Sequence, residues 1–178
     1  MKTNLIIRFA ICFLVISCSK QPSLDKYFVD NATDKNFVAI DVSPAMFNTT
    51  KAKFTPEQVD ALKSFDKMNV LYFKKTAQNT VAFEAERAKI KAVLNDEKYQ
   101  DLMKFGVGKD GANISYVGSD DHISEFIISG SKDDIGLGVV RIQGKDMKPE
   151  NVMKVMEAMQ KGNFDMEALK PIFDMIKK

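Results

Sequence analysis

The only histidine of this 178-residue chain, His122, lies in an acidic stretch. Asp120 and Asp121 precede it, and Glu125 follows three residues later. A histidine beside carboxylates could act as a general base or bind a metal ion. A catalytic triad would also need a nucleophile held by this histidine, and the sequence has no G-x-S-x-G motif to present one. We therefore interpret His122 as part of a solvated turn, and Asp120, Asp121 and Glu125 as the acids available to an enzyme without a recognisable motif.

A literal G-x-G-x-x-G motif occupies residues 106–111 (GVGKDG). In dinucleotide-binding proteins this motif follows a strand and opens a helix, so that the phosphates meet the helix N-terminus. Here the apolar pattern predicts the opposite order, with a helical segment before the motif and a strand after it. We interpret the glycines as a helix C-cap and turn and expect no nucleotide cofactor.

Three methionines, Met153, Met156 and Met159, have the spacing M-x-x-M-x-x-M. Thioethers can bind Cu(I) in exported proteins. On a helix these side chains span roughly 120°, which is also the width of a core-facing stripe. Since methionine packs well into irregular cores, we expect core packing here and no metal site.

The remaining carboxylates form no recognisable pair. Asp121 and Asp133 lie at opposite ends of an expected strand of about ten residues, about 30 Å apart, so they cannot share a metal ion. Other acids are interspersed with basic residues, as in Glu84-Ala-Glu86-Arg87. Such a mixture is typical of solvated helix surfaces. A glycosidase pair could not be recognised from sequence spacing, so an enzyme stays an alternative.

The N-terminus predicts lipid attachment at Cys18. Lys2 and Arg8 provide a positive region, and Phe9–Ile16 is an apolar run too short to span a bilayer. Residues 15–18 (VISC) then look like a lipobox, in which the cysteine receives diacylglycerol. The alternatives are an ordinary cleavable signal, which would need an A-x-A-like site, or an uncleaved anchor with an incidental cysteine. We expect residues 1–17 to be removed as a lipoprotein signal peptide.

Cleavage leaves a balanced chain without free thiols. The 26 basic residues become 24, equal to the 24 acidic ones, because Lys2 and Arg8 are removed and no acid is. A net charge near zero disfavours nucleic acid and polybasic contact with lipid headgroups as partners. Cys12 leaves with the signal and Cys18 is acylated, which excludes disulfides and thiolate chemistry.

The elements that would position these residues belong to one domain. Residues 18–35 are predicted as a lipidated tether with a short helix around Leu24–Phe28, and residues 36–178 as a single domain. Period-two alternation predicts strands, and i, i+3, i+4 apolar spacing predicts helices. Strands are expected at 37–42, 68–75, 112–117, 122–129 and 135–143. Helices are expected from a Thr55 capping box onward, at 80–94, around Tyr99–Met103, at 149–160 and, broken at Pro171, at 164–176.

This order predicts an α+β fold. The first two strands, separated by a helix, permit a parallel crossover, and the last three form an antiparallel meander. We expect a five-stranded mixed sheet with the helices packed on one face.

The chain resembles a family of small Bacteroidota lipoproteins known as domain of unknown function four-two-five-two. The resemblance covers about Phe37 to Met159 and depends on four segments, 37–47 (FVAIDVSPAMF), 99–103 (YQDLM), 123–128 (ISEFII) and 139–144 (VVRIQG). It implies an envelope lipoprotein without an established activity or cofactor, whose genes can lie near extracytoplasmic sigma factors. It provides no functional residues to carry over.

The sequence thus predicts a non-enzymatic binding or interaction module, anchored through Cys18 and serving envelope sensing or assembly. The tether at 19–23 (SKQPS) lacks the acidic residues that resemble a surface-export signal, which favours an outer-membrane position facing the periplasm. The partner would be an envelope protein, and the sequence does not indicate an oligomeric state. The alternatives are a hydrolase-like enzyme using carboxylates, or a carrier of an apolar ligand lined by the methionine-rich helices.

Overall fold

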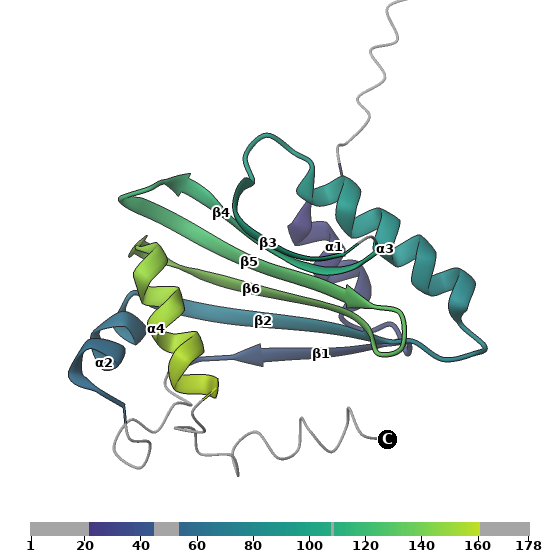
Figure 1. Ribbon diagram of the computed structural model, residues 1–178, viewed down its shortest axis with the longest axis horizontal. Helices are drawn as coiled ribbons and strands as arrows, with labels where there is room; N and C mark the ends of the chain where they lie inside the picture. The colour runs from purple at the N-terminus through teal and green to yellow at the C-terminus, as the bar shows by residue number, and fades with distance from the viewer. Residues whose placement is uncertain (1–21, 45–53, 108, 161–178) are drawn as a thin grey trace, which may run out of the picture.

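The computed structural model describes residues 22–44, 54–107 and 109–160. Within them the chain forms four helices and six strands (Figure 1). In chain order these elements are α1 (Leu24–Asn31), β1 (Phe37–Val42), α2 (Pro56–Lys63), β2 (Phe65–Lys74), α3 (Thr80–Leu94), β3 (Gln100–Val107), β4 (Asp110–Ser119), β5 (His122–Lys132), β6 (Gly136–Met147) and α4 (Pro149–Gln160).

The α+β class is confirmed, but the sheet differs from the predicted one. It has six strands in the order β1-β2-β6-β5-β4-β3, and every neighbouring pair is antiparallel. The expected parallel crossover is absent because β2 turns back where β1 ends, with Val42 opposite Met68. The eight-residue helix α2 packs at this end of the sheet against α4 and does not carry the chain back along β1.

The additional strand, which the sequence did not predict, is β3. It occupies the segment predicted as a helix around Tyr99–Met103. This prediction was wrong because a β-bulge lies between Asp101 and Met103. A bulge adds a residue to one strand and shifts its alternation, which here produces a helix-like apolar spacing. Tyr99 and Leu102 in fact pack in two different core clusters.

The helices cover both faces of the sheet, so the prediction of one covered face was also wrong. Side chains of a strand alternate between faces. In β5, Phe126 packs in the cluster of α2 and α4, whereas Ile127 packs in the cluster of α1 and α3. Figure 1 accordingly shows α4 in front of the strands and α1 behind them.

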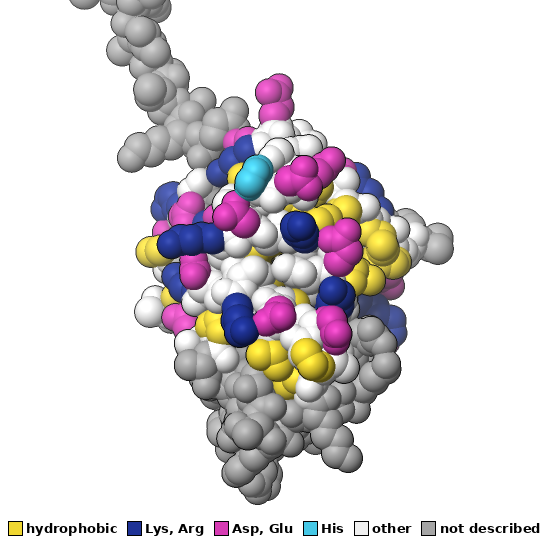
Figure 2. Space-filling model, turned by 90° about the vertical axis from the view of Figure 1, so that its left-hand side faces the viewer, with side chains coloured by type: hydrophobic (Ala, Val, Ile, Leu, Met, Phe, Trp, Pro, Cys, Tyr) yellow, Lys and Arg dark blue, Asp and Glu magenta, His cyan; other side chains and the backbone are white. Residues whose placement is uncertain are grey.

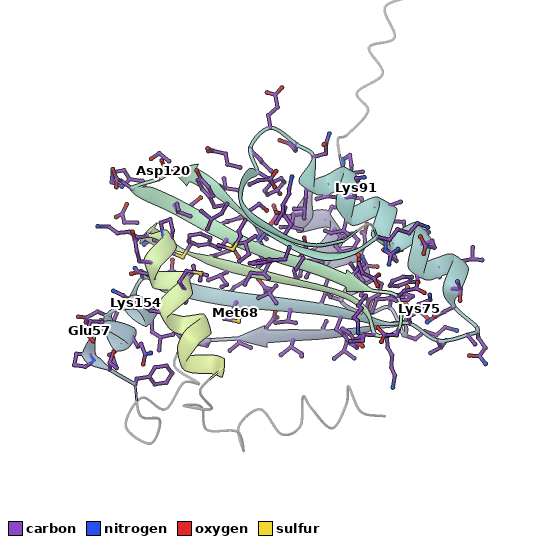
Figure 3. All side chains as sticks on the ribbon, in the orientation of Figure 1. Glu57, Met68, Lys75, Lys91, Asp120 and Lys154 are labelled. Atoms are coloured by element: carbon purple, nitrogen blue, oxygen red, sulfur yellow. The ribbon has the colours of Figure 1, made fainter. Side chains whose placement is uncertain are left out.

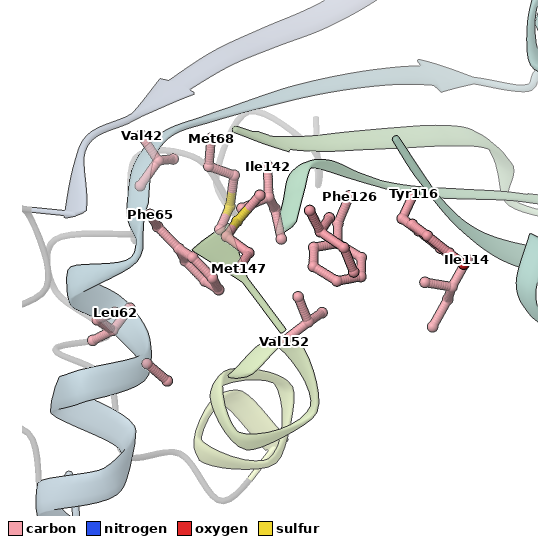
Figure 4. Packing of buried hydrophobic residues seen from close by; sticks show 12 residues of the cluster. Val42, Leu62, Phe65, Met68, Ile114, Tyr116, Phe126, Ile142, Met147 and Val152 are labelled. Carbon is pink, nitrogen blue, oxygen red and sulfur yellow. The ribbon is translucent and has the colours of Figure 1, made fainter. Parts of the chain in front are cut away.

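The core on the α4 face forms around large side chains from strands and helices (Figure 4). Phe126, Met147 and Val152 are almost fully buried there. The predicted capping box starts α2: Gln58 N–H donates to Thr55 Oγ1 at 3.3 Å, and Thr55 N–H donates to Gln58 Oε1 at 2.9 Å. These reciprocal bonds satisfy two donors that the first turn would otherwise leave free.

The helix predicted around Leu24–Phe28 is present as α1. It is packed into the second core cluster, with Leu24 completely buried and Tyr27 nearly so. The folded part of the chain therefore includes residues that the sequence assigns to the tether. At most five residues, 19–23, separate Cys18 from this helix.

The remaining predicted elements are present with small changes in their ends. The predictions for 37–42, 80–94 and 149–160 coincide with β1, α3 and α4. The predicted helix at 164–176 and Cys18 lie outside the described residues. Within the described part of the chain, none of the helices has the length and apolar character needed to cross a membrane.

Candidate functional site

His122 lies on the surface, as predicted. Its Nδ1 is 2.7 Å from Oδ1 of Asp146, and both side chains are about three-quarters exposed. This end of the molecule mixes basic and acidic side chains without a large patch of one sign (Figure 2). The expected solvated turn is therefore confirmed, with Asp146 as a partner that the sequence did not indicate.

The three acids considered for an enzyme do not form one site. Asp120 accepts a hydrogen bond from the Tyr116 hydroxyl at 2.7 Å, on the α4 face, and this contact raises the pKa of the phenol. Glu125 is paired instead with Arg141 of the neighbouring strand. Within the described residues, no group of three or more His, Cys, Asp or Glu side chains could hold a metal ion.

The two acidic turns are far apart, as predicted. Asp133 forms an ion pair with Lys75 at 2.5 Å, and this pairing lowers the pKa of the Asp133 carboxyl. Lys75 and Asp120 lie at opposite ends of the sheet (Figure 3). The turn that contains Asp121 therefore does not contribute to a site with Asp133.

The G-x-G-x-x-G segment forms the hairpin between β3 and β4. Gly106 pairs with Gly111, and Val107 with Asp110. Gly106 has φ of 104°, and a Cβ there would approach Asp110 O to 2.3 Å. The glycines thus allow a close approach of two strands, and a strand, not the predicted helix, precedes the motif. The prediction of a strand after the motif is confirmed, and the prediction of a helix before it is wrong.

The methionine triplet lies in α4. Met153 is 45% exposed, whereas the neighbouring Val152 is buried in the core. The prediction of core packing is therefore wrong for Met153. The side chains of Met156 and Met159 lie outside the described part, so for these two it stays a prediction.

A groove of about 620 Å³ lies between α3 and the ends of the β3–β4 hairpin and β5; we call it the α3 groove. Small residues form its floor because two short segments pair with each other: Gly111, Ala112 and Asn113 oppose Ser131, Gly130 and Ser129. Its other lining residues are Glu84, Arg87, Ala88, Ile90, Lys91, Leu94, Asn95, Asp101, Lys104, Phe105, Gly106, Lys109, Asp110 and Leu137.

Arg87 is the most buried charged group along this groove. Its side chain is 14% exposed, and its guanidinium lies over the Phe83 ring at 4.5 Å. Nη1 donates to Glu84 Oε1 at 3.3 Å, and Nη2 forms an ion pair with Asp110 Oδ1 at 3.7 Å. Within the described structure, Nε and Nη2 are buried without a hydrogen-bond partner. Such donors normally find an acceptor, since leaving them unpaired costs free energy.

Asn113 of β4 is a second polar residue that lines the groove. Its Nδ2 donates to Asp101 Oδ1 at 2.8 Å, and Asp101 is also ion-paired with Lys104. Hydrogen bonds from Lys104 and then from Asn113 lower the pKa of Asp101. An ionised carboxylate only accepts, so it fixes the orientation of the amide. Asn113 Oδ1 is left buried without a partner in the described part of the molecule.

Sequence reasoning did not find the α3 groove. Its residues come from a helix and three strands whose pairing was unknown, and β3 was interpreted as a helix. The available signal was the recurrence of small residues at 111–113 and 129–131 at opposite ends of two predicted strands. Only the antiparallel register brings those segments side by side.

The described residues form an α+β fold with a six-stranded antiparallel sheet covered by helices on both faces. The family model described as Domain of unknown function (DUF4252) matches residues 27–155, more than half of the chain. The chain belongs to this family, which confirms the resemblance inferred from the four segments. Comparisons with curated proteins and with solved structures give no match.

Proposed function

We propose that this protein is a non-enzymatic binding module, anchored by lipid on Cys18 at the outer membrane and facing the periplasm, whose ligand site is the α3 groove. The observation that carries the binding role is a groove of about 620 Å³ whose lining combines charged side chains with a stretch of small residues from β4 and β5.

The short connection to the anchor supports a position close to the membrane. Five residues extend to at most about 18 Å, and Leu24 is already part of the core. A domain held in this way would meet its partner near the lipid surface. The family membership is consistent with an unassigned activity and does not favour catalysis.

The two other functions have less support. An enzyme using Asp120, Asp121 or Glu125 would need these acids together, and two of them are engaged on opposite faces of the sheet. A carrier lined by the methionine-rich helices would need a cavity beside α4, whereas the α3 groove lies on the other face. Binding at the α3 groove therefore accounts best for the geometry.

Photo-crosslinking in the native envelope tests the binding role. A photoreactive amino acid replaces Lys91, which projects from α3 (Figure 3) and lines the groove. A matched variant carries it at the exposed Lys63 of α2. We expect one discrete adduct from position 91 only. We also expect Ser129→Leu, which fills the groove floor, to abolish it while the thermal melt stays cooperative. Equal adducts from both positions, or adducts unaffected by Ser129→Leu, would contradict the proposal.

A further inference from the structure

Part of the sheet is apolar but has no helix of the described chain in front of it. On the α4 face, beyond the side chains that α4 covers (Figure 1), two rows of residues cross all six strands. The strand register gives the first row as Ile40, Val70, Val140, Ile128, Ile114 and Met103, and the second as Val38, Tyr72, Gly138, Gly130, Ala112 and Phe105. We call these two rows the open rows. None of their residues is charged.

The exposure of the side chains changes where the covered part of this face ends. Phe126 and Ile142, which pack with α4, are buried. Every residue of the open rows except Ile114 is partly or fully exposed. Met103 is 37% exposed and Phe105 is 54% exposed. The open rows therefore form a continuous apolar surface that the described helices leave in contact with water.

The other face of the sheet has polar side chains where it is exposed. Asp41 and Lys67 are exposed, and because they precede Val42 and Met68 of the α4-side cluster, they lie on the opposite face. Contiguous exposed apolar surface, in contrast, marks a place where another element docks. We propose that the element docked on the open rows is the C-terminal segment of the same chain, residues 164–176, packed as a helix beside α4.

The dimensions of the open rows fit one helix. Neighbouring strands are about 4.8 Å apart and the two rows about 7 Å apart, so the open rows cover an area about 25 Å long and about 10 Å wide. A helix over residues 164–176 would be about 20 Å long and about 10 Å in diameter. A second copy of the chain would need about 800 Å² on each partner, which is well above the area of the open rows.

The place where α4 ends also fits this occupant. α4 ends at Gln160, on the side of the sheet that carries the open rows (Figure 1). Residues 161–163 (KGN) then provide a connection of the length found between two antiparallel helices. The middle of the open rows lies about 10 Å from the row that α4 covers, which is a normal distance between the axes of packed helices. The returning helix would therefore pack against both α4 and the sheet.

The sequence of the segment has the apolar stripe that this helix needs. The apolar residues with i, i+3, i+4 spacing are Met166, Leu169, Ile172, Phe173 and Ile176. Glu167 and Asp174 fall on the opposite side of the helix. Pro171 predicts a kink near its middle, which suits packing on a sheet whose strands twist.

Photo-crosslinking within one chain tests this docking independently of the α3 groove. The mature chain, purified in detergent, carries a photoreactive amino acid in place of Phe173, and mass spectrometry of the digested protein maps the adducts. We expect adducts within the same chain, on residues of the open rows. The matched variant carries the photoreactive amino acid in place of Asp174, on the opposite side of the helix, and should give at least about fivefold fewer of these adducts.

Thermal melts provide a second measurement. Phe173→Asp places a charge against the open rows and should lower the melting temperature by about 5 °C. Asp174→Asn on the opposite side should change it by less than about 1 °C. Adducts on the α1 face, on a second copy or on detergent would overturn the proposal, as would equal yields from both positions. A melting temperature that Phe173→Asp leaves unchanged would overturn it as well.

Discussion

Nη1 of Arg141 in β6 donates a 2.7 Å hydrogen bond to Oδ1 of Asp25 in α1, joining residues that are 116 positions apart. Nη2 of the same guanidinium pairs with Glu125 of β5. Arg141 is 8% exposed, whereas Asp25 is 69% exposed. The arginine thus connects helix α1 to the middle of the sheet, and the two acids paired with it differ strongly in burial.

This difference predicts unequal effects of removing the two acids. Glu125→Leu leaves a buried guanidinium with one exposed counterion, and we expect it to lower the free energy of unfolding by about 3 kcal/mol. Asp25→Ala removes a solvent-screened contact and should cost less than about 1 kcal/mol. Urea unfolding of both variants measures the effect. Equal losses of unfolding free energy in the two variants would mean that burial does not determine how much each acid contributes to stability.

Leu24 tests whether α1 belongs to the folded domain. Because Leu24 is completely buried in the second core cluster, Leu24→Ala should lower the free energy of unfolding by about 3 kcal/mol. The matched control, Val29→Ala in the same helix, changes a side chain that is 73% exposed and should stay within about 0.5 kcal/mol. Similar small effects for both would indicate that residues 24–31 are part of a tether.

Two glycines differ in whether the fold requires glycine at their positions. Gly106 has a positive φ and no room for a Cβ, so Gly106→Ala should cost more than about 2 kcal/mol. A Cβ at Gly138 would meet no atom within 4 Å, so Gly138→Ala should be neutral or stabilising by up to about 1 kcal/mol. Denaturant midpoints of the two variants test this. If the order were reversed, the hairpin geometry assigned to the G-x-G-x-x-G segment would be wrong.

The depressed pKa values of Asp101 and Asp133 predict a loss of stability in acid. Both lie below the ordinary value of 3.8, chiefly through hydrogen bonds from Lys104 and Lys75 respectively. The folded state therefore holds fewer protons than the unfolded state near pH 3 to 4. Their stabilisation is fully present above the unfolded pKa and is lost as the pH falls through the folded values.

The double variant Asp101→Asn, Asp133→Asn checks this dependence. Its free energy of unfolding, measured by denaturant between pH 5 and pH 2, should fall less steeply than that of the unmodified protein. The difference should shrink in high salt because both carboxylates are largely exposed. A double variant with the same slope as the parent would show that these two pairs do not contribute to acid sensitivity.

Local sequence signals predicted the elements that depend on neighbouring residues. The capping box at Thr55 and the apolar stripe of α3 are local features, and both helices begin where expected. The bulge between Asp101 and Met103 is not a local preference but a result of pairing with β4, and it converted a strand into a helix-like pattern. The direction of β2 likewise depends on α2 packing against α4, which lies far away in sequence.

For the site, too, local features were predicted from the sequence, and features that depend on long-range pairing were not. The surface position of His122 follows from neighbouring turn residues, and the structure confirms it. The turn at the glycine motif was also expected, but the helix predicted before it is a strand. The burial of Arg87 depends on how α3 lies over the sheet, and the orientation of the Asn113 amide depends on its hydrogen bond to Asp101 across the β3–β4 pair. Neither relationship can be derived before the strand order is known.

The proposed envelope role depends most directly on the chemistry of Cys18. Intact mass spectrometry of the protein extracted from its native membrane, with Cys18→Ala as the control, measures that chemistry. We predict a polypeptide that begins at Cys18 and carries two or three acyl chains, sufficient for stable anchoring, and a control without them. A membrane-extracted product whose N-terminus is unmodified, or a protein recovered from the cytosol, would contradict the assignment.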